Sequence, residues 1–168
     1  MKKIWNEIKP YIYIVVIVVL FRTFVATPAV VDGDSMVGTL NNNDLVVLNK
    51  IIMHFNNIDR FDIVVIENDK DQGQDKIIKR VIGLPNEKIE YKDNVLYIND
   101  KQVKMNSGVT YETTEDFVAQ TKDNEYFVLG DNRDISKDSR YVGNFTKDEI
   151  LGKVDFRFYP FDKIGFIK

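Results

Sequence analysis

The sequence predicts a mainly β protein preceded by one N-terminal apolar helix, and two observations lead to this fold class. A basic N-terminus runs into an apolar segment at residues 11–21. The rest of the chain carries short runs of β-branched and aromatic residues between turn-forming residues, with no long segment of helical periodicity. A length of 168 residues suits one domain with a modest core.

The N-terminal segment has the composition of a membrane anchor. Lys2, Lys3 and Lys9 precede the apolar run, and this charge bias orients a span with its N-terminus in the cytoplasm. The uninterrupted run is short for a span and also fits a signal-peptide core. Apolar character resumes after Arg22, whose long side chain can carry its charge to the membrane interface. We favour a retained anchor, while a cleaved signal peptide and a buried core element remain alternatives.

The anchored reading divides the chain into two parts. On this reading, residues 1–27 are expected to form the cytoplasmic tip and transmembrane anchor, and residues 28–168 a β-rich domain outside the cell membrane. The first 31 residues carry a net charge of +3, so the remainder carries −6 of the total −3. An acidic body argues against nucleic acid as a partner. The chain has no cysteine, which excludes disulfides, cysteine zinc sites and thiol catalysis.

Strands are expected wherever short apolar runs stand between turn residues. Residues 90–97 are typical of a hairpin with a tight turn. Residues 147–150 are expected to form one helical turn, with Thr146 as its cap. The stretch 101–124 is the least apolar and is the expected peripheral insertion. The strand predictions are 45–48, 63–66, 77–78 with 81–82, 95–98, 126–129 and 154–158.

The segment 130–140 is the most informative stretch of the chain. It follows an apolar run and contains three Asp, two Arg, one Lys, two Ser and one Asn. Eleven residues are too many for a tight hairpin turn. A solvated surface loop is the simplest explanation of this composition. Ser35-Met36 and Lys79-Arg80, in their own sequence contexts, favour a functional explanation instead.

Ser35 is a candidate nucleophile that needs a base to take its proton. The single histidine, His54, lies in an apolar context typical of a structural residue, which argues against a Ser–His–Asp triad. Lys79 lies between apolar pairs of a predicted strand. Burial there would lower the pKa of its amine and allow it to act as a base. An exposed position on a half-buried strand is the alternative for Lys79.

Four segments together resemble the soluble sequence boxes of bacterial type I signal peptidases. They are residues 35–40, 60–65, 79–85 and 130–140, and they occur in the family's order. With the N-terminal anchor they extend over most of the chain, and the short anchor is similar to the single-anchor, Gram-positive type. The resemblance implies a signal-peptidase-like catalytic β-fold and a membrane-bound serine endopeptidase.

The chain departs from the family pattern at a few positions. The family usually has Pro where Gly38 stands, Gly where Phe61 stands, and Gly-Asp where Asn86 and Glu87 stand. Asparagine tolerates a left-handed backbone, so Asn86 can replace a turn glycine. Gly38 is expected to loosen the segment after the nucleophile. None of these changes removes a reacting atom.

The resemblance also implies the roles of the site residues. Ser35 would be the nucleophile, and its backbone N–H would contribute to the oxyanion hole. Lys79 would be the general base, and Ser136 would orient it through a hydrogen bond to Nζ. Some members carry a hydroxyl two residues before the nucleophile, where this chain has Gly33. The supporting ion pairs would be Arg80 with Asp131 and Asp138 with Arg140.

The substrate implied by the resemblance is the signal peptide of an exported preprotein, cleaved after a small-x-small sequence. It would lie extended between the strand that ends near Gly33 and the strand 76–79, as an added strand. No cofactor and no metal is implied. The partners are signal peptides, the lipid bilayer and, as a further candidate, the protein export machinery. Small apolar pockets would be lined by Val31, Gly33, Met36, Leu40, Ile77 and Ile78.

Two other functions are weighed against this one. A self-cleaving Ser–Lys repressor would need a DNA-binding helical domain where the apolar anchor stands. A catalytically inactive signal-peptidase homologue, acting as a binding or scaffold protein, is the main alternative. Retention of Ser35, Lys79 and Ser136 together argues against it.

Overall fold

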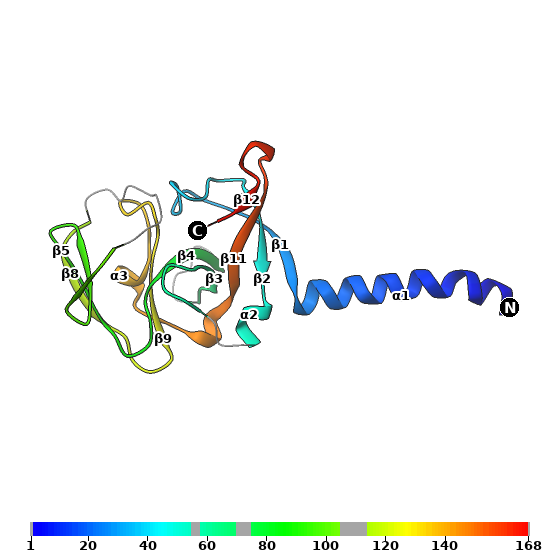
Figure 1. Cartoon of the computed structure of the whole chain (residues 1–168), viewed down its shortest axis with the longest axis horizontal. Coiled ribbons are helices and arrows are strands. Elements are labelled where there is room, and N and C mark those ends of the chain that lie inside the picture. The colour runs from blue at the N-terminus through cyan, green and yellow to red at the C-terminus, as the bar shows by residue number, and fades with distance from the viewer. Residues whose placement is uncertain (1, 55–57, 70–74, 105–113, 168) are drawn as a thin grey trace.

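The computed structural model describes residues 2–54, 58–69, 75–104 and 114–167. The first element is α1 (Lys2–Phe24), a helix of 23 residues that projects from a body made almost entirely of strands (Figure 1). The predicted mainly β fold class with one N-terminal helix is confirmed. Among the described residues, no helix combines the length and the apolar character required of a membrane span.

The large sheet has eight antiparallel strands in the order β1-β2-β11-β3-β4-β9-β10, with β12 paired to β11. It contains the predicted strands 45–48, 63–66, 77–82, 126–129 and 154–158. Its members are β1 (Ala26–Val30), β2 (Leu45–Asn49), β3 (Ile63–Glu67), β4 (Lys76–Gly83), β9 (Glu125–Leu129), β10 (Phe145–Thr146), β11 (Ile150–Tyr159) and β12 (Gly165–Phe166).

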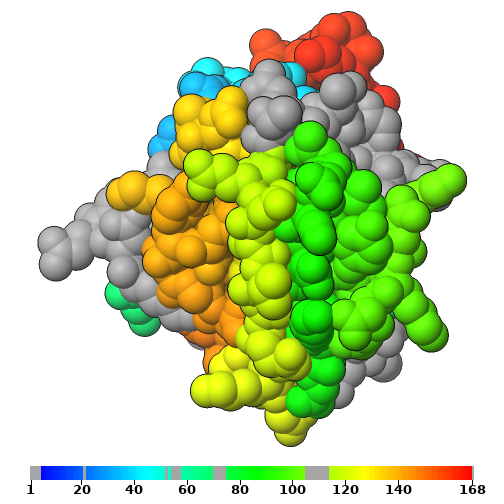
Figure 2. Space-filling view, turned by 90° about the vertical axis from the view of Figure 1, so that its left-hand side faces the viewer, coloured from blue at the N-terminus to red at the C-terminus, as the bar shows by residue number. Residues whose placement is uncertain are grey.

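A second, four-stranded sheet forms the end of the body opposite α1, where its strands lie side by side (Figures 1 and 2). The predicted hairpin joins β5 and β6 through Asp93 and Asn94, whose φ angles of 50° and 62° suit a tight hairpin turn. The stretch 101–124 supplies both outer strands, and its residues 105–113 lie outside the described part. The order is β7 (Lys101–Val103), β6 (Val95–Ile98), β5 (Lys88–Lys92) and β8 (Phe117–Gln120).

Short helical turns connect the strands. The predicted turn after Thr146 is a 3-10 helix, η1 (Lys147–Glu149), and the Glu149 carboxylate accepts hydrogen bonds from the Thr146 N–H and hydroxyl. His54 ends the short helix α2 (Ile51–His54), which lies beside the large sheet. The other two turns are α3 (Ser139–Val142) and η2 (Phe161–Lys163).

Strand β4 sorts its side chains between two apolar clusters, because alternate residues of a strand face opposite sides of a sheet. Ile77 and Val81 join a cluster on one face, with Val64, Ile66 and Val128. Ile78 packs against the cluster on the other face. A third cluster fills the space between the two sheets and includes Ile82, Ile89, Tyr91, Phe127 and Leu129.

We predict that Asn86→Ala lowers the free energy of unfolding by ~1 kcal/mol, because a left-handed backbone is costly for a residue with an ordinary side chain. Asn86 has a φ of 62° and is exposed. Asn86→Gly keeps the favoured backbone and is the matched control. Urea unfolding of the full chain in detergent measures both. An equal loss in the two variants would contradict the explanation, since it would implicate the amide group.

Candidate active site

The Ser35 hydroxyl and the Lys79 amine are in direct contact. Lys79 Nζ donates a hydrogen bond of 2.7 Å to Ser35 Oγ. Ser35 begins the turn 35–39 that follows β1, and Lys79 lies on β4. The sequence separates these residues by 44 positions, so the fold alone brings the predicted nucleophile and the predicted base together.

Lys79 is only 3% exposed, and this burial changes its acid–base behaviour. Loss of solvation lowers the pKa of its amine to about 8, although the nearby carboxylates of Asp138 and Asp131 act in the opposite direction. A substantial neutral fraction therefore exists close to neutral pH. A neutral lysine can accept the proton of a hydroxyl that it contacts.

Backbone hydrogen bonds at Ser35 and just after it fix the position of this residue. The Asn132 N–H donates to the Ser35 carbonyl at 3.0 Å, which joins the turn 35–39 to the polar loop 130–140. The Leu40 N–H donates to the Met36 carbonyl at 2.8 Å, and both side chains are buried in the core. The turn is thus held by the core through its apolar residues and by the polar loop through its backbone.

Arg80 and Asp131 form the first predicted ion pair, and both side chains are buried. Arg80 Nε and Nη2 donate to the two carboxylate oxygens of Asp131 at 2.8 and 2.7 Å. Arg80 Nη1 donates to the Phe61 carbonyl at 2.9 Å, and Thr39 Oγ1 donates to Asp131 at 2.6 Å. The pair is confirmed, and the surrounding donors and acceptors satisfy its remaining hydrogen-bonding groups.

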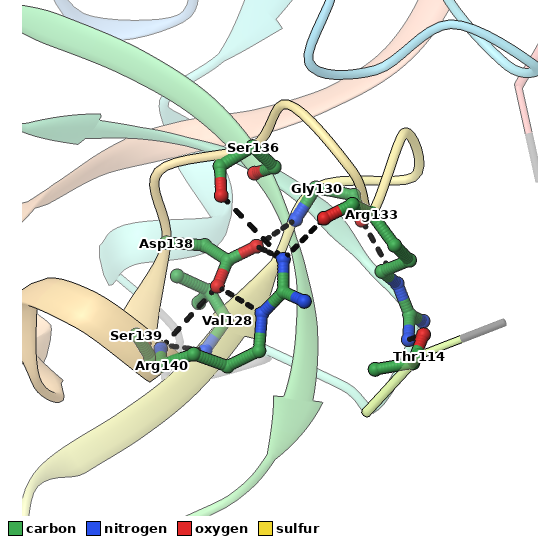
Figure 3. Close-up of polar contacts among 8 residues, drawn as sticks. All are labelled: Thr114, Val128, Gly130, Arg133, Ser136, Asp138, Ser139 and Arg140. Atoms are coloured by element: carbon green, nitrogen blue, oxygen red, sulfur yellow. Dashed lines mark hydrogen bonds and ion pairs between the residues drawn. The ribbon is translucent and has the colours of Figure 1, made fainter. Parts of the chain in front are cut away.

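Asp138 and Arg140 form the second predicted pair, which is also confirmed (Figure 3). Arg140 Nε and Nη2 donate to the two oxygens of Asp138 at 2.8 and 2.9 Å. The Gly130 N–H donates to the same carboxylate at 3.1 Å, and Arg140 Nη2 reaches the Arg133 carbonyl at 2.8 Å. The polar loop therefore folds around a buried ion pair and is not a simple solvated loop.

The predicted hydrogen bond between Ser136 and Lys79 is wrong. Ser136 is buried, and its Oγ has no hydrogen-bond partner among the described residues. The side chain lies against Gly130 instead, where an added Cβ atom would clash with Ser136 Oγ. The close packing of Ser136 on Gly130 explains why this position of the loop needs glycine. Lys79 Nζ is directed at Ser35 without help from Ser136.

A cavity of about 300 Å³ lies beside Ser35 and Lys79. Of the predicted pocket residues, Gly33 and Ile77 line it. Val31, Met36, Leu40 and Ile78 do not line this cavity, because the first three are buried in the core and Ile78 faces the other side of β4. Their part in a substrate pocket stays a prediction. The other lining residues, which were not predicted from the sequence, are Asp32, Asp34, Asn68, Ile135, Lys137 and Val142.

Some of the missed residues carried a signal in the sequence. Ile135 and Lys137 flank Ser136 within the polar loop, and Asp32 and Asp34 flank Gly33. Asn68 and Val142 carried none, since the fold brings them to the cavity from the end of β3 and from α3. Within the described ranges, no three His, Cys, Asp or Glu side chains lie close enough together to hold a metal ion.

One edge of β4 is open next to Ser35 and Lys79. β4 pairs with β3 from Lys76 to Arg80, whereas β9 pairs with it only from Arg80 to Gly83. Along 76–79 the second edge of β4 has no strand partner among the described residues. An unpaired edge of this kind can accept an extended peptide as an additional strand.

Comparison with known proteins identifies the family. The profile described as "Signal peptidase, peptidase S26" matches residues 4–159. The chain belongs to this family. Its enzyme class is therefore type I signal peptidase, and it removes signal peptides from preproteins as a serine protease. Proteins of the bacterial signal peptidase I family are associated with membranes.

Individual relatives support the assignment over nearly the whole chain. Signal peptidase I S of Bacillus subtilis (strain 168) is 39% identical over 175 residues, covering 97% of this chain and 93% of the relative. Signal peptidase IB of Staphylococcus aureus (strain MRSA252) is 36% identical over 169 residues, covering 90% and 87%. A crystal structure of a signal peptidase I from Enterococcus faecalis V583 matches with a TM-score of 0.50 and 34% identity, covering 57% of this chain and 95% of that chain.

We predict that the Lys79 amine in the folded chain is half-protonated near pH 8, and that Asp138→Asn moves this midpoint to lower pH. Of the charges that raise the pKa of Lys79, the carboxylate of Asp138 has the largest effect. Its removal therefore allows burial to lower the pKa further. NMR titration of the full chain with ¹⁵N-labelled lysine, in detergent, measures the midpoint. A midpoint near the ordinary lysine value of about 10.4 would contradict the burial effect.

Proposed function

We propose that the chain cleaves signal peptides with a Ser–Lys dyad, in which Ser35 is the nucleophile and Lys79 is the general base. The observation that carries the proposal is the 2.7 Å contact between Ser35 Oγ and the buried amine of Lys79. The lowered pKa of Lys79 supports a base that is neutral for part of the time at cellular pH.

The proposed reaction begins when neutral Lys79 accepts the proton of Ser35 as Oγ attacks the scissile carbonyl carbon. Lys79 then returns this proton to the leaving amine, and an acyl-enzyme on Ser35 remains. A water molecule, deprotonated by Lys79, hydrolyses the ester and regenerates the hydroxyl. The Ser35 backbone N–H is proposed as one donor to the oxyanion, because Gly33 supplies no hydroxyl.

The two ion pairs are proposed to keep Lys79 able to lose its proton. A carboxylate near a lysine stabilises the ammonium form and raises its pKa. Arg80 occupies both oxygens of Asp131, and Arg140 occupies both oxygens of Asp138, so each carboxylate is compensated locally. Arg80, Asp131, Asp138 and Arg140 support the site in this proposal and do not react.

The substrate is proposed to lie extended along the open edge of β4, with the residue that precedes the scissile bond facing the Ile78 side. The buried side chains of Met36 and Leu40 belong to the apolar cluster on that side. Close packing there would penalise large substrate side chains and accept alanine. This arrangement supports cleavage after small-x-small sequences.

We predict that Ser35→Ala and Lys79→Arg each lower kcat/KM for a signal-peptide substrate by at least about 10³-fold, because each removes a group that reacts. Arginine keeps the positive charge of Lys79 but does not lose its proton near neutral pH. Lys101→Arg, at an exposed position of the small sheet, is the matched control. Purified full-length chains in detergent provide the assay.

Two results would contradict the dyad. Cleavage by Ser35→Ala within tenfold of wild type would remove the nucleophile assignment. Near-normal cleavage by Lys79→Arg would show that the site needs charge and not basicity. A wild-type chain that binds the substrate without cleaving it would favour the alternative of a scaffold protein.

We also propose that α1 anchors the chain, with the N-terminus in the cytoplasm and the body on the other side of the membrane. Between Tyr11 and Leu20 the apolar side chains of α1 are exposed around the helix, and the helix projects away from the body (Figure 1). An apolar helix that is uncovered by protein needs another apolar environment. Contact with the protein export machinery is consistent with this placement.

We predict that protease added outside spheroplasts digests the body of the full chain, whereas a tag fused before Lys2 stays protected. The basic N-terminus ahead of the apolar run is the physical reason, because positive charge is retained on the cytoplasmic side. Alkaline carbonate extraction of the same membranes is the second measurement. Release of the chain by carbonate, or digestion of the tag, would contradict the anchor and its orientation.

A further inference from the structure

We propose that the cavity beside the dyad receives the side chain of the middle residue of the small-x-small sequence, and that it favours a large aliphatic residue there. The middle residue is the second residue before the scissile bond. The inference rests on the proposed function, in which the signal peptide lies as an added strand along residues 76–79 of β4. The middle position, which the small-x-small rule leaves unrestricted, would thus have a binding site of its own.

The direction of the middle side chain follows from strand geometry. Side chains of an added strand alternate between the two faces of the sheet, so the two small residues face one side and the middle residue faces the other. On β4, Ile78 faces the apolar cluster that contains Met36 and Leu40. Ile77 and Lys79 face the opposite side and line the cavity. The register of β4 with β3 is regular over this segment, so the alternation is undisturbed.

The walls of the cavity determine which side chain it suits. Ile77 and Val142 are the inner aliphatic walls, and Ile135 covers the cavity from the polar loop with 58% of its surface exposed. Asn68 contributes a polar group at the end of β3. An aliphatic side chain would bury apolar surface against three aliphatic residues, and this transfer from water is favourable.

The charges around the cavity do not favour one sign. Asp32, Asp34 and Lys137 all contribute to its lining. All three side chains are exposed, so solvent screens them. Size and apolar area are therefore the properties that the cavity distinguishes.

The size of the cavity supports a large side chain over a small one. A volume of about 300 Å³ lies at the lower end of ligand pockets and exceeds the space of several water molecules. An alanine at the middle position leaves most of this space to water. A leucine displaces the water, and we expect an advantage of about tenfold in kcat/KM, since the cavity is open on one side.

The test compares two signal-peptide substrates that differ only at the middle residue, Ala-Leu-Ala and Ala-Ala-Ala before the scissile bond. The measured quantity is the ratio of their kcat/KM values with the full-length chain in detergent. We expect a ratio of about ten for wild type and a ratio near one for Ile135→Trp, whose larger side chain fills the cavity. Ile135→Ala, which removes one wall, is expected to give an intermediate ratio.

Val118→Trp is the matched control, because Val118 is an exposed aliphatic residue on β8 of the small sheet. It is expected to keep the wild-type ratio. A general disturbance of folding would lower both kcat/KM values together and leave their ratio unchanged. The ratio therefore reports the cavity separately from the integrity of the site.

Each outcome decides the proposal. A wild-type ratio near one would overturn it, and so would an unchanged ratio in both Ile135 variants. In either of these results both peptides are still cleaved, so the proposed function would remain intact. If the folded wild-type chain cleaved neither peptide, the proposed function and this inference would both be contradicted.

Discussion

Lys79, the proposed base, lies close to two carboxylates that favour its charged form, and the rest of the site is organised around this conflict. Burial lowers the pKa of Lys79, while Asp131 and Asp138 raise it. The fold resolves the conflict by giving each carboxylate an arginine with two hydrogen bonds. The pair of Arg80 with Asp131 also ties the polar loop to β4. The next residue of the loop, Asn132, donates its N–H to the Ser35 carbonyl, so the compensated loop also holds Ser35 in place.

Much of this arrangement could be predicted from the sequence. Asp138 and Arg140 lie two residues apart, and the positions of the strands at 45–48, 63–66, 126–129 and 154–158 followed from runs of β-branched and aromatic residues between turns. The contact of Ser136 could not be predicted, because the side chain's direction depends on its packing against Gly130. The residues that line the cavity could not be predicted either. It depends on where β9 stops pairing with β4, and only the assembled sheet defines that point.

Two departures from the family pattern coincide with unusual backbone. Phe61 has a φ of 74°, and its carbonyl accepts a hydrogen bond from buried Arg80. A glycine would adopt this backbone at little cost, so phenylalanine accepts strain there and packs its ring on the cluster between the sheets. Gly38 has a φ of 107°, a conformation that proline cannot adopt. Replacing the family's usual proline with glycine therefore permits a different path of the turn after Ser35.

The connection between α1 and Ser35 has a mechanical consequence. Residues 26–30 between them pair with β2 along their whole length, so this segment of about 17 Å cannot stretch or coil. Under the proposed function, in which α1 lies in the membrane and Ser35 is the nucleophile, this paired strand fixes part of the distance between the membrane and Ser35. A signal peptide whose apolar helix ends in the membrane would need extended chain of comparable length before its scissile bond reaches Ser35. The length of β1 would therefore limit how close to its apolar segment a signal peptide is cut.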